Sequence, residues 1–171
     1  MPPDLQLCLA LLDQATAGLD EQAAVTRVDG RWSIAEIVEH LDRTYSGTTK
    51  GFDRCLQGGV PRASRHTMKS RLRVWLVVTC GYFPSGIEAP SHVVPTGQLS
   101  LSAAMEEART HLAALAEAAL TARARFGSGP VMDHPVLGPL SVDQWLKFHR
   151  IHTRHHHRQI IERRARLERA A

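Results

Sequence analysis

Aromatic residues are scarce in this chain, which argues against a sheet-rich fold. Aromatic side chains make up 5% of the 171 residues, while hydrophobic residues in total make up 43%, as in globular proteins. The many Ala, Leu, Arg and Glu residues favour helices instead. Because the length allows one sizeable core, we expect a single domain over residues 1–171.

Cysteines are too few and too far apart to form a recognisable framework. Cys8, Cys55 and Cys80 are odd in number and widely spaced, so they form no CxxC metal motif and no evident set of disulfides. We interpret them as small buried residues and expect a reducing, cytoplasmic location. The N-terminus has no basic region followed by a hydrophobic stretch and a cleavage site, so secretion is not expected.

Long hydrophobic runs and a strong charge are also missing. No apolar run approaches the ~20 residues of a membrane span, so we expect no membrane partner. The formal net charge is only +4, and much of it lies between Arg158 and Arg169. Basic residues there would complement the negative end of a last helix. Nucleic-acid binding is therefore not expected.

Helical periodicity and capping signals divide the chain into four long helices and a short one. The expected helices lie near residues 3–24, 33–57, 100–126 and 141–169, with a short helix near 68–82. Ser33 with Glu36, and Ser141 with Gln144, have the spacing of capping boxes. Prolines and glycines mark residues 84–98, and also the stretch before Ser141, as loops.

These segments predict an all-α fold. Four long helices with one extended connection, residues 58–99, are typical of a four-helix bundle. A connection of this length, which contains the short helix, would let the second and third long helices run parallel rather than as a hairpin.

Histidines crowd the last expected helix. His152 and His156 are four residues apart, so they lie on one face about one turn apart. This is the arrangement by which a helix offers two imidazoles to one metal ion. A third ligand must come from elsewhere, and His40 is the best candidate. His155 and His157 point to either side of this face and are expected to be solvated or packed against neighbouring helices.

The histidines also have simpler interpretations. A lone His on an apolar helix face, such as His40, is typically a core residue with one hydrogen bond. Two buried imidazoles one turn apart, however, would repel each other if charged and are hard to satisfy if neutral, whereas a metal ion resolves both problems. His149 lies about 10 Å along the axis from His156, so we expect it to line the pocket or support a ligand. Gln159 is expected to hydrogen-bond a ligand imidazole or a metal-bound water.

Two groups of motifs resemble a known superfamily. The first is Trp32-Ser33-Ile34 followed by Glu39-His40-Leu41; the second is His134-Pro135-Val136-Leu137-Gly138-Pro139-Leu140, then Trp145, then His152-x-x-x-His156-x-Arg158-Gln159-Ile160. They resemble the second and last helices of the DinB/YfiT-like metalloenzymes. Many members of that superfamily have Gly where this chain has Arg158.

The resemblance implies a bundle in up-down-down-up order that binds a divalent metal through one His of the second helix and two of the last. By motif, those ligands are His40, His152 and His156. The superfamily includes transferases and isomerases that use bacillithiol, mycothiol or glutathione. Its members often pair through their helices, so a homodimer is expected.

Three imidazoles leave an open position on a divalent ion, which is typical of a catalytic site rather than a structural one. Imidazole suits Zn, Ni, Fe and Cu, and we expect zinc first and nickel second. We predict a metalloenzyme whose ion activates a low-molecular-weight thiol or water toward a small-molecule substrate. The alternative is a non-catalytic metal-binding bundle with a structural, sensing or storage role. No carboxylate stands out as a general base.

Overall fold

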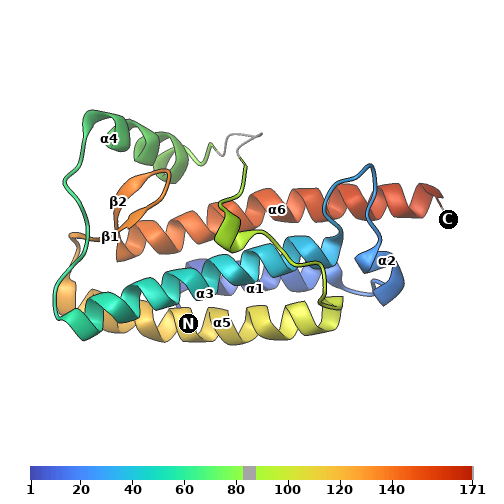
Figure 1. Ribbon diagram of the computed structural model, residues 1–171, viewed down its shortest axis with the longest axis horizontal. Coiled ribbons are helices and arrows are strands. Elements are labelled where there is room, and N and C mark those ends of the chain that lie inside the picture. Colours follow the sequence, from blue (N-terminus) through green and yellow to red (C-terminus); the bar gives the residue numbers. More distant parts are fainter. Residues whose placement is uncertain (83–87, 171) are drawn as a thin grey trace.

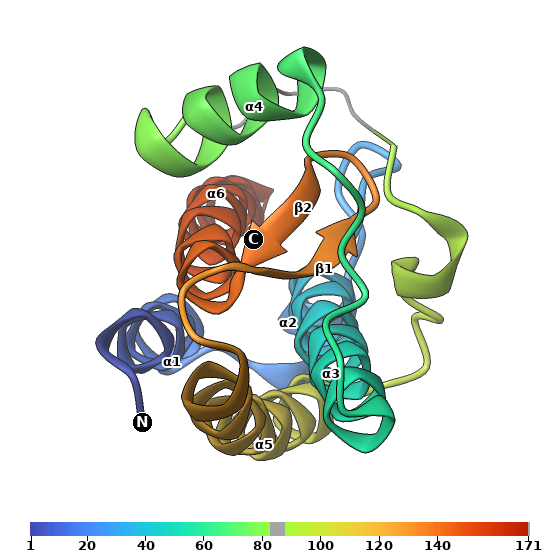
Figure 2. The ribbon, with the colours of Figure 1, turned by 90° about the vertical axis from the view of Figure 1, so that its left-hand side faces the viewer.

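Four long helices lie side by side in the computed structural model, which describes residues 1–82 and 88–170 (Figure 1). They are α1 (Pro3–Thr16), α3 (Ile34–Gly58), α5 (Leu101–Phe126) and α6 (Val142–Ala170). α3 packs along α5 and α1 along α6, and the end-on view shows the four around a common centre (Figure 2). The prediction of a mostly helical fold is therefore confirmed in this broad form.

The core consists of the apolar stripes that these helices turn toward one another. Its largest fully buried side chains include Leu5 and Leu12 of α1, Tyr45 and Phe52 of α3, Leu112 and Leu115 of α5, and Ile160 of α6. Each stripe repeats at helical spacing, so burial of one face stabilises each helix. None of the helices in the described residues is long and apolar enough to cross a membrane.

Capping boxes begin both helices that later carry the candidate site. At α3, the carboxylate of Glu36 accepts from the backbone N–H of Ser33 at 2.8 Å, and Ser33 Oγ accepts from the N–H of Glu36 at 3.2 Å. Ser141 and Gln144 make the same exchange before α6, at 2.9 and 3.3 Å. Two otherwise unpaired backbone donors are satisfied each time, which fixes where the helix begins.

The first helix is shorter than the predicted span of residues 3–24. α1 ends at Thr16, and Gly18 then adopts φ +66°, a left-handed conformation that glycine takes at little cost. The side chain of Asp20 accepts from the N–H of Ala23 at 2.9 Å and begins a separate short helix, α2 (Glu21–Val25). The prediction of one continuous helix was wrong because Gly18 ends the first helix in a turn and Asp20 caps a new one.

A β-hairpin replaces the loop predicted before α6. β1 (Pro130–His134) and β2 (Gly138–Ser141) pair antiparallel, with Met132 opposite Leu140. Prolines in both short strands hid the alternation of side chains in the sequence. Val131 and Leu140 are fully buried, so the hairpin stands on the bundle beside the start of α6.

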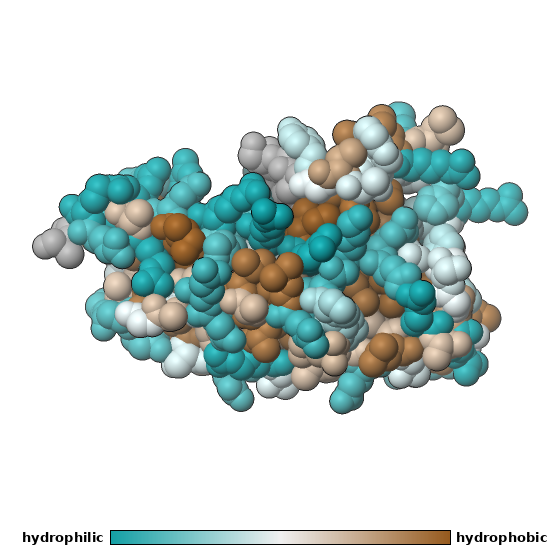
Figure 3. All heavy atoms as spheres, turned by 180° about the vertical axis from the view of Figure 1, so that it is seen from behind, coloured by the Kyte–Doolittle hydropathy of each residue, from teal (hydrophilic) through white to brown (hydrophobic). Residues whose placement is uncertain are grey.

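The short segment predicted near residues 68–82 is helical, and it leaves several apolar side chains exposed. α4 (Met68–Val74) continues as a π-helical turn, η1 (Trp75–Thr79). One apolar side of the segment is turned to solvent, since Leu72 is 57% exposed and Trp75 is 54% exposed. The opposite side, with Val74, Val77 and Val78, is buried instead. On the rear face of the molecule, exposed hydrophobic side chains lie among charged ones at this raised segment (Figure 3).

The connection to α5 runs alongside α3. Of the loop predicted over residues 84–98, residues 84–87 lie outside the described residues. The remainder is irregular except for η2 (Ser91–Val93), a short 3-10 turn that contacts α3. Ser100 accepts from the N–H of Ala103 at 3.2 Å and begins α5, close to the predicted start near residue 100.

Candidate metal centre

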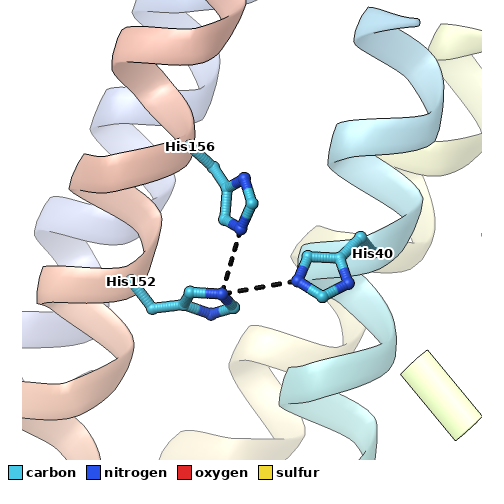
Figure 4. A group of neighbouring side chains, drawn as sticks. All are labelled: His40, His152 and His156. Carbon is cyan, nitrogen blue, oxygen red and sulfur yellow. Dashed lines mark hydrogen bonds between the residues drawn. The ribbon is translucent and has the colours of Figure 1, made fainter. Parts of the chain in front are cut away.

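Three histidines from two helices meet in the interior. His40 projects from α3, and His152 and His156 project from successive turns of α6 toward it (Figure 4). The Nε2 atom of His152 lies 3.3 Å from Nε2 of His40 and 3.0 Å from Nε2 of His156. One ligand atom from each residue lies within 4.8 Å of the others, and all three side chains are buried. The structure thus brings together the three residues proposed as ligands.

Hydrogen bonds at the outer edge of two rings fix their tautomers. Nδ1 of His40 lies 2.8 Å from the carbonyl oxygen of Val93, and Nδ1 of His156 lies 2.8 Å from Oε1 of Gln159. Because both oxygens can only accept, each imidazole carries its proton at Nδ1. The Nε2 atoms of His40 and His156 therefore turn lone pairs toward the Nε2 atom of His152.

This donor set fits a divalent ion. Nε2 of His152 carries one proton at most and could donate it to only one of its two neighbours, whereas a cation would satisfy all three nitrogens at once. Tetrahedral zinc at its usual distance from imidazole places two ligand nitrogens roughly 3.3 Å apart. The observed separations of 3.3 and 3.0 Å match this spacing.

Burial keeps these imidazoles in the neutral form that binds metals. It lowers the pKa of His40 and lowers the pKa of His156 to about 3, and in the latter the nearby His40 adds to the effect. Burial, followed by repulsion from His156 and His40, holds the pKa of His152 well below its ordinary value. Neutral imidazole is the state in which His ligates a metal.

A carboxylate on α3 holds the segment that follows Val93 in place. Glu39 is buried and accepts from Thr96 N–H and Oγ1–H, both at 2.8 Å, and from Gly97 N–H at 3.1 Å. Burial acts to raise the pKa of Glu39, but these hydrogen bonds outweigh it, so the pKa lies below its usual value. Glu39, the residue directly before His40, therefore attaches the loop after η2 to α3.

The three histidines line a large open cleft. Its volume is about 1720 Å³, and α3, the η2 loop, the hairpin and α6 contribute its walls. The ring of Trp32 lies 5.1 Å from that of His40, and Phe148 stacks on His152 at 5.3 Å between ring centroids. The sequence singled out Trp32 only within a motif and did not single out Phe148, although Phe148 stands four residues before His152.

One comparison with known proteins reaches across most of the chain. A family model described as "Protein of unknown function (DUF1569)" matches residues 5–163. The chain belongs to this family. No curated protein and no solved structure matches it. The DUF1569 match includes all three clustered histidines and every wall of the cleft.

In this DUF1569 protein, His149 lines the cleft without joining the cluster. It is fully buried, and its Nε2 lies 3.0 Å from Oγ1 of Thr48. The Thr48 hydroxyl donates to the carbonyl of Thr44, so His149 is the donor to Thr48. This leaves His149 Nδ1 without a hydrogen-bond partner in the part of the chain that the structure describes.

Gln159 joins two histidines of the DUF1569 chain. Its Oε1 accepts from His156, and its Nε2 donates to Nε2 of His155 at 3.1 Å. His155 is only partly buried and stands outside the cluster, as does His157. His134 was singled out only within a motif; in the structure its ring lies 4.4 Å from that of Phe148, on the hairpin wall.

Charged residues near the cluster are engaged elsewhere. Glu36 binds Arg27 and the start of α3, whereas Asp42 lies 2.6 Å from Nδ1 of His111. With Glu39 committed to the loop, the DUF1569 chain places no free carboxylate of α3 beside His40. Arg71 and Arg73 are exposed and lie outside the cleft lining, and Arg73 donates to the carbonyl oxygen of Val136 at 3.0 Å.

Proposed function

We propose that this protein is a DinB-like metalloenzyme in which His40, His152 and His156 hold a catalytic divalent ion. The observation that carries the proposal is the convergence of three buried, neutral imidazoles at distances that suit one ion. The order of the helices supports it too. The colours of Figure 1 run in one sense along α3 and α5 and in the opposite sense along α1 and α6, as in an up-down-down-up bundle.

Zinc is the first candidate for the ion and nickel the second, because imidazole suits both. When bound by three imidazoles, such an ion supplies a Lewis acid with an open position, which lowers the pKa of a water or thiol placed there. The chain's own residues prepare this position. Val93 and Gln159 hold two imidazoles in the ligating tautomer, as outer partners of metal ligands commonly do.

The cleft suits a small-molecule substrate together with a low-molecular-weight thiol or water. Trp32 and Phe148 give its walls an apolar surface beside the ligands, and such surfaces exclude bulk water from a reacting group. We propose transfer of a thiol to an electrophile, or hydrolysis, as the reaction.

A non-catalytic metal-binding bundle is the alternative function. A structural zinc site is normally closed by four protein ligands. Among the described residues, the group able to hold an ion contains three His and no fourth His, Cys, Asp or Glu. An open cleft beside three ligands supports catalysis over a structural, sensing or storage role.

A homodimer in the cytoplasm completes the proposal. Pairing of subunits is the commonest assembly of oligomeric proteins. Analytical ultracentrifugation at micromolar concentration tests it: a single species at the chain mass of 18.9 kDa would contradict the homodimer.

An activity screen tests the catalytic proposal. Protein loaded with zinc or nickel is assayed against small electrophiles with glutathione, mycothiol or bacillithiol, and against activated esters and amides without a thiol. We expect turnover that follows metal content and is lost in His156→Ala but kept in the matched control His157→Ala. Absence of turnover in every arm, with metal bound, would favour the non-catalytic alternative.

A further inference from the structure

A buried arginine lies in the same cleft, beyond the histidines. Arg163 of α6 is 5% exposed and lines the cleft. Its Nε donates to the carbonyl oxygen of Trp32 at 3.4 Å. Among the residues that the structure describes, its two terminal nitrogens have no hydrogen-bond partner and no ion-pair partner, yet they are not sealed from solvent. The end of the guanidinium group is therefore available to a ligand.

This situation is unusual for a buried cation. Arginines are rarely so buried unless a carboxylate pairs with them, because removing the charge from water is costly. Other arginines of this chain do have such partners: Arg27 pairs with Glu36, Arg43 with Glu39, Arg109 with Asp13, Arg150 with Asp4, and Arg166 with Asp29. All five are more exposed than Arg163.

The surroundings of Arg163 are also positive on balance. Burial lowers the pKa of its guanidinium, and the neighbouring Arg31 and Arg166 lower it further, against weaker opposing effects of Glu162 and Asp29. Arg31 lines the cleft at this end as well. A small anion entering the cleft would thus meet both a positive field and unused donors.

Two geometric links connect Arg163 to the three histidines. It follows His156 by seven residues, so it lies on the same helical stripe about 10 Å further along the axis. Side chains in a helix lean toward its N-terminus, which brings the guanidinium back toward His156. Trp32 spans the remaining distance, with its carbonyl at Arg163 and its ring 5.1 Å from the ring of His40.

We propose that Arg163 binds a carboxylate group of the small molecule whose other end reaches the three-histidine centre. The two terminal nitrogens of a guanidinium match the two oxygens of a carboxylate in a planar, bidentate pair. The carboxylate site rests on the burial and free donors of Arg163 alone. Its role as the anchor of a substrate or co-substrate rests on the proposed function.

A first experiment tests the anion site in metal-free protein. Propionate, its neutral analogue propionamide and inorganic phosphate are titrated while the Nε–H resonance of Arg163 is followed by NMR, with Arg163→Lys as the assignment control. We expect a saturable shift with propionate, none with propionamide, and the same result in Arg158→Gln, which removes an exposed arginine of the same helix. A missing propionate response, or tighter binding of phosphate than of propionate, would overturn the carboxylate assignment.

A second experiment tests the anchoring role in full-length protein loaded with Co(II). The charge-transfer absorption of a Co(II)–thiolate bond reports the binding of mercaptohexanoate and of mercaptohexanol, which have the same chain length. We expect Arg163→Gln to weaken mercaptohexanoate roughly tenfold to a hundredfold while mercaptohexanol changes less than about twofold. Arg163→Lys should fall between, because it keeps the charge and loses the planar fork. Arg158→Gln should change neither affinity.

The two experiments separate two kinds of failure. If the protein bound no Co(II), the proposed function would fail, and the propionate titration would still decide on the anion site. If Co(II) and both thiols bound but Arg163→Gln weakened them equally, or weakened neither, the anchoring role would be wrong while the metal centre stood. Circular dichroism of each variant shows whether it is folded.

Discussion

His152 occupies the middle of the cluster, which makes it the least replaceable of the three histidines. Its Nε2 is the atom that lies within 3.3 Å of both other ligand nitrogens. We predict that His152→Ala abolishes stoichiometric binding of zinc, whereas His155→Ala retains it, because His155 stands outside the cluster. Metal content per chain, measured by mass spectrometry after gel filtration, decides this. Loss in His155→Ala with binding kept in His152→Ala would contradict the ligand assignment.

Buried neutral histidines also make stability depend on pH. Burial, followed by repulsion from His134, lowers the pKa of His149 to about 3, while an unfolded chain titrates near the ordinary value of about 6.5. Below about pH 6.5, the unfolded state therefore binds a proton that the folded state does not. The contribution is fully present above that pH and is lost as the pH falls toward 3, by about 1.4 kcal/mol per pH unit.

We predict that His149→Gln flattens this dependence by about that slope between pH 6 and pH 4. Urea unfolding of metal-free protein at several pH values measures it, so that metal release does not contribute. The control is His66→Gln, which changes an exposed residue. An unchanged slope in His149→Gln would contradict the assigned burial effect.

The sequence could predict the pair His152 and His156, but it could predict only one of the two hydrogen-bond partners that fix the ligand tautomers. His152 and His156 were predictable because helix geometry alone places residues four apart on one face. Gln159 follows the same logic, since it is three residues from His156. The partner of His40 was not predictable, because it is a backbone carbonyl, that of Val93, at the end of a short 3-10 turn 53 residues away. A carbonyl group has no residue signature, and its place depends on how the loop folds.

At the level of the elements, one buried carboxylate holds the loop around Val93 in position against α3. Glu39 accepts three hydrogen bonds from Thr96 and Gly97 and pairs with Arg43 at 3.0 Å. We predict that Glu39→Ala weakens zinc binding roughly tenfold to a hundredfold without touching a ligand, because outer partners of metal ligands have effects of this size. Competition with a chromophoric chelator measures the affinity.

A matched control removes a carboxylate that does not serve this loop. Asp13→Ala breaks the exposed pair between Asp13 and Arg109 and should leave zinc affinity unchanged, since exposed pairs contribute little. Equal affinities in wild type and Glu39→Ala would mean that His40 does not depend on the η2 loop for its orientation.

The starts of α3 and α6 were predictable and the hairpin was not, for a physical reason. Capping boxes at Ser33 and Ser141 are local signals, and both helices begin within one residue of the predicted position. The hairpin depends on pairing between two short segments and on Gly138 at φ +83°, which no single segment reveals. The outward face of α4 was unpredictable because a 3.6-residue pattern shows that a helix has two sides but not which side packs.

For the whole molecule, the cleft arises where separate parts of the fold meet. α3 and α6 supply the histidines, the hairpin adds His134, and the η2 loop adds Val93. The apolar core lies among the four long helices and holds residues from each of them. Because that core involves no ion, we expect the fold to persist when a bound metal is removed.

Because the apolar core is separate from the three-histidine centre, the effect of metal removal can be predicted. Chelation should leave the helical circular dichroism intact and lower the melting temperature. An ion that binds only the folded state stabilises it by about 2.7 kcal/mol when free metal exceeds the dissociation constant a hundredfold. For a chain of this size that corresponds to roughly 5–10 °C. Differential scanning calorimetry with and without chelator measures the shift, and His156→Ala should show none. Unfolding upon chelation at 25 °C would instead assign the ion to structure, because a catalytic ion in a preformed cleft is not required for the core to pack.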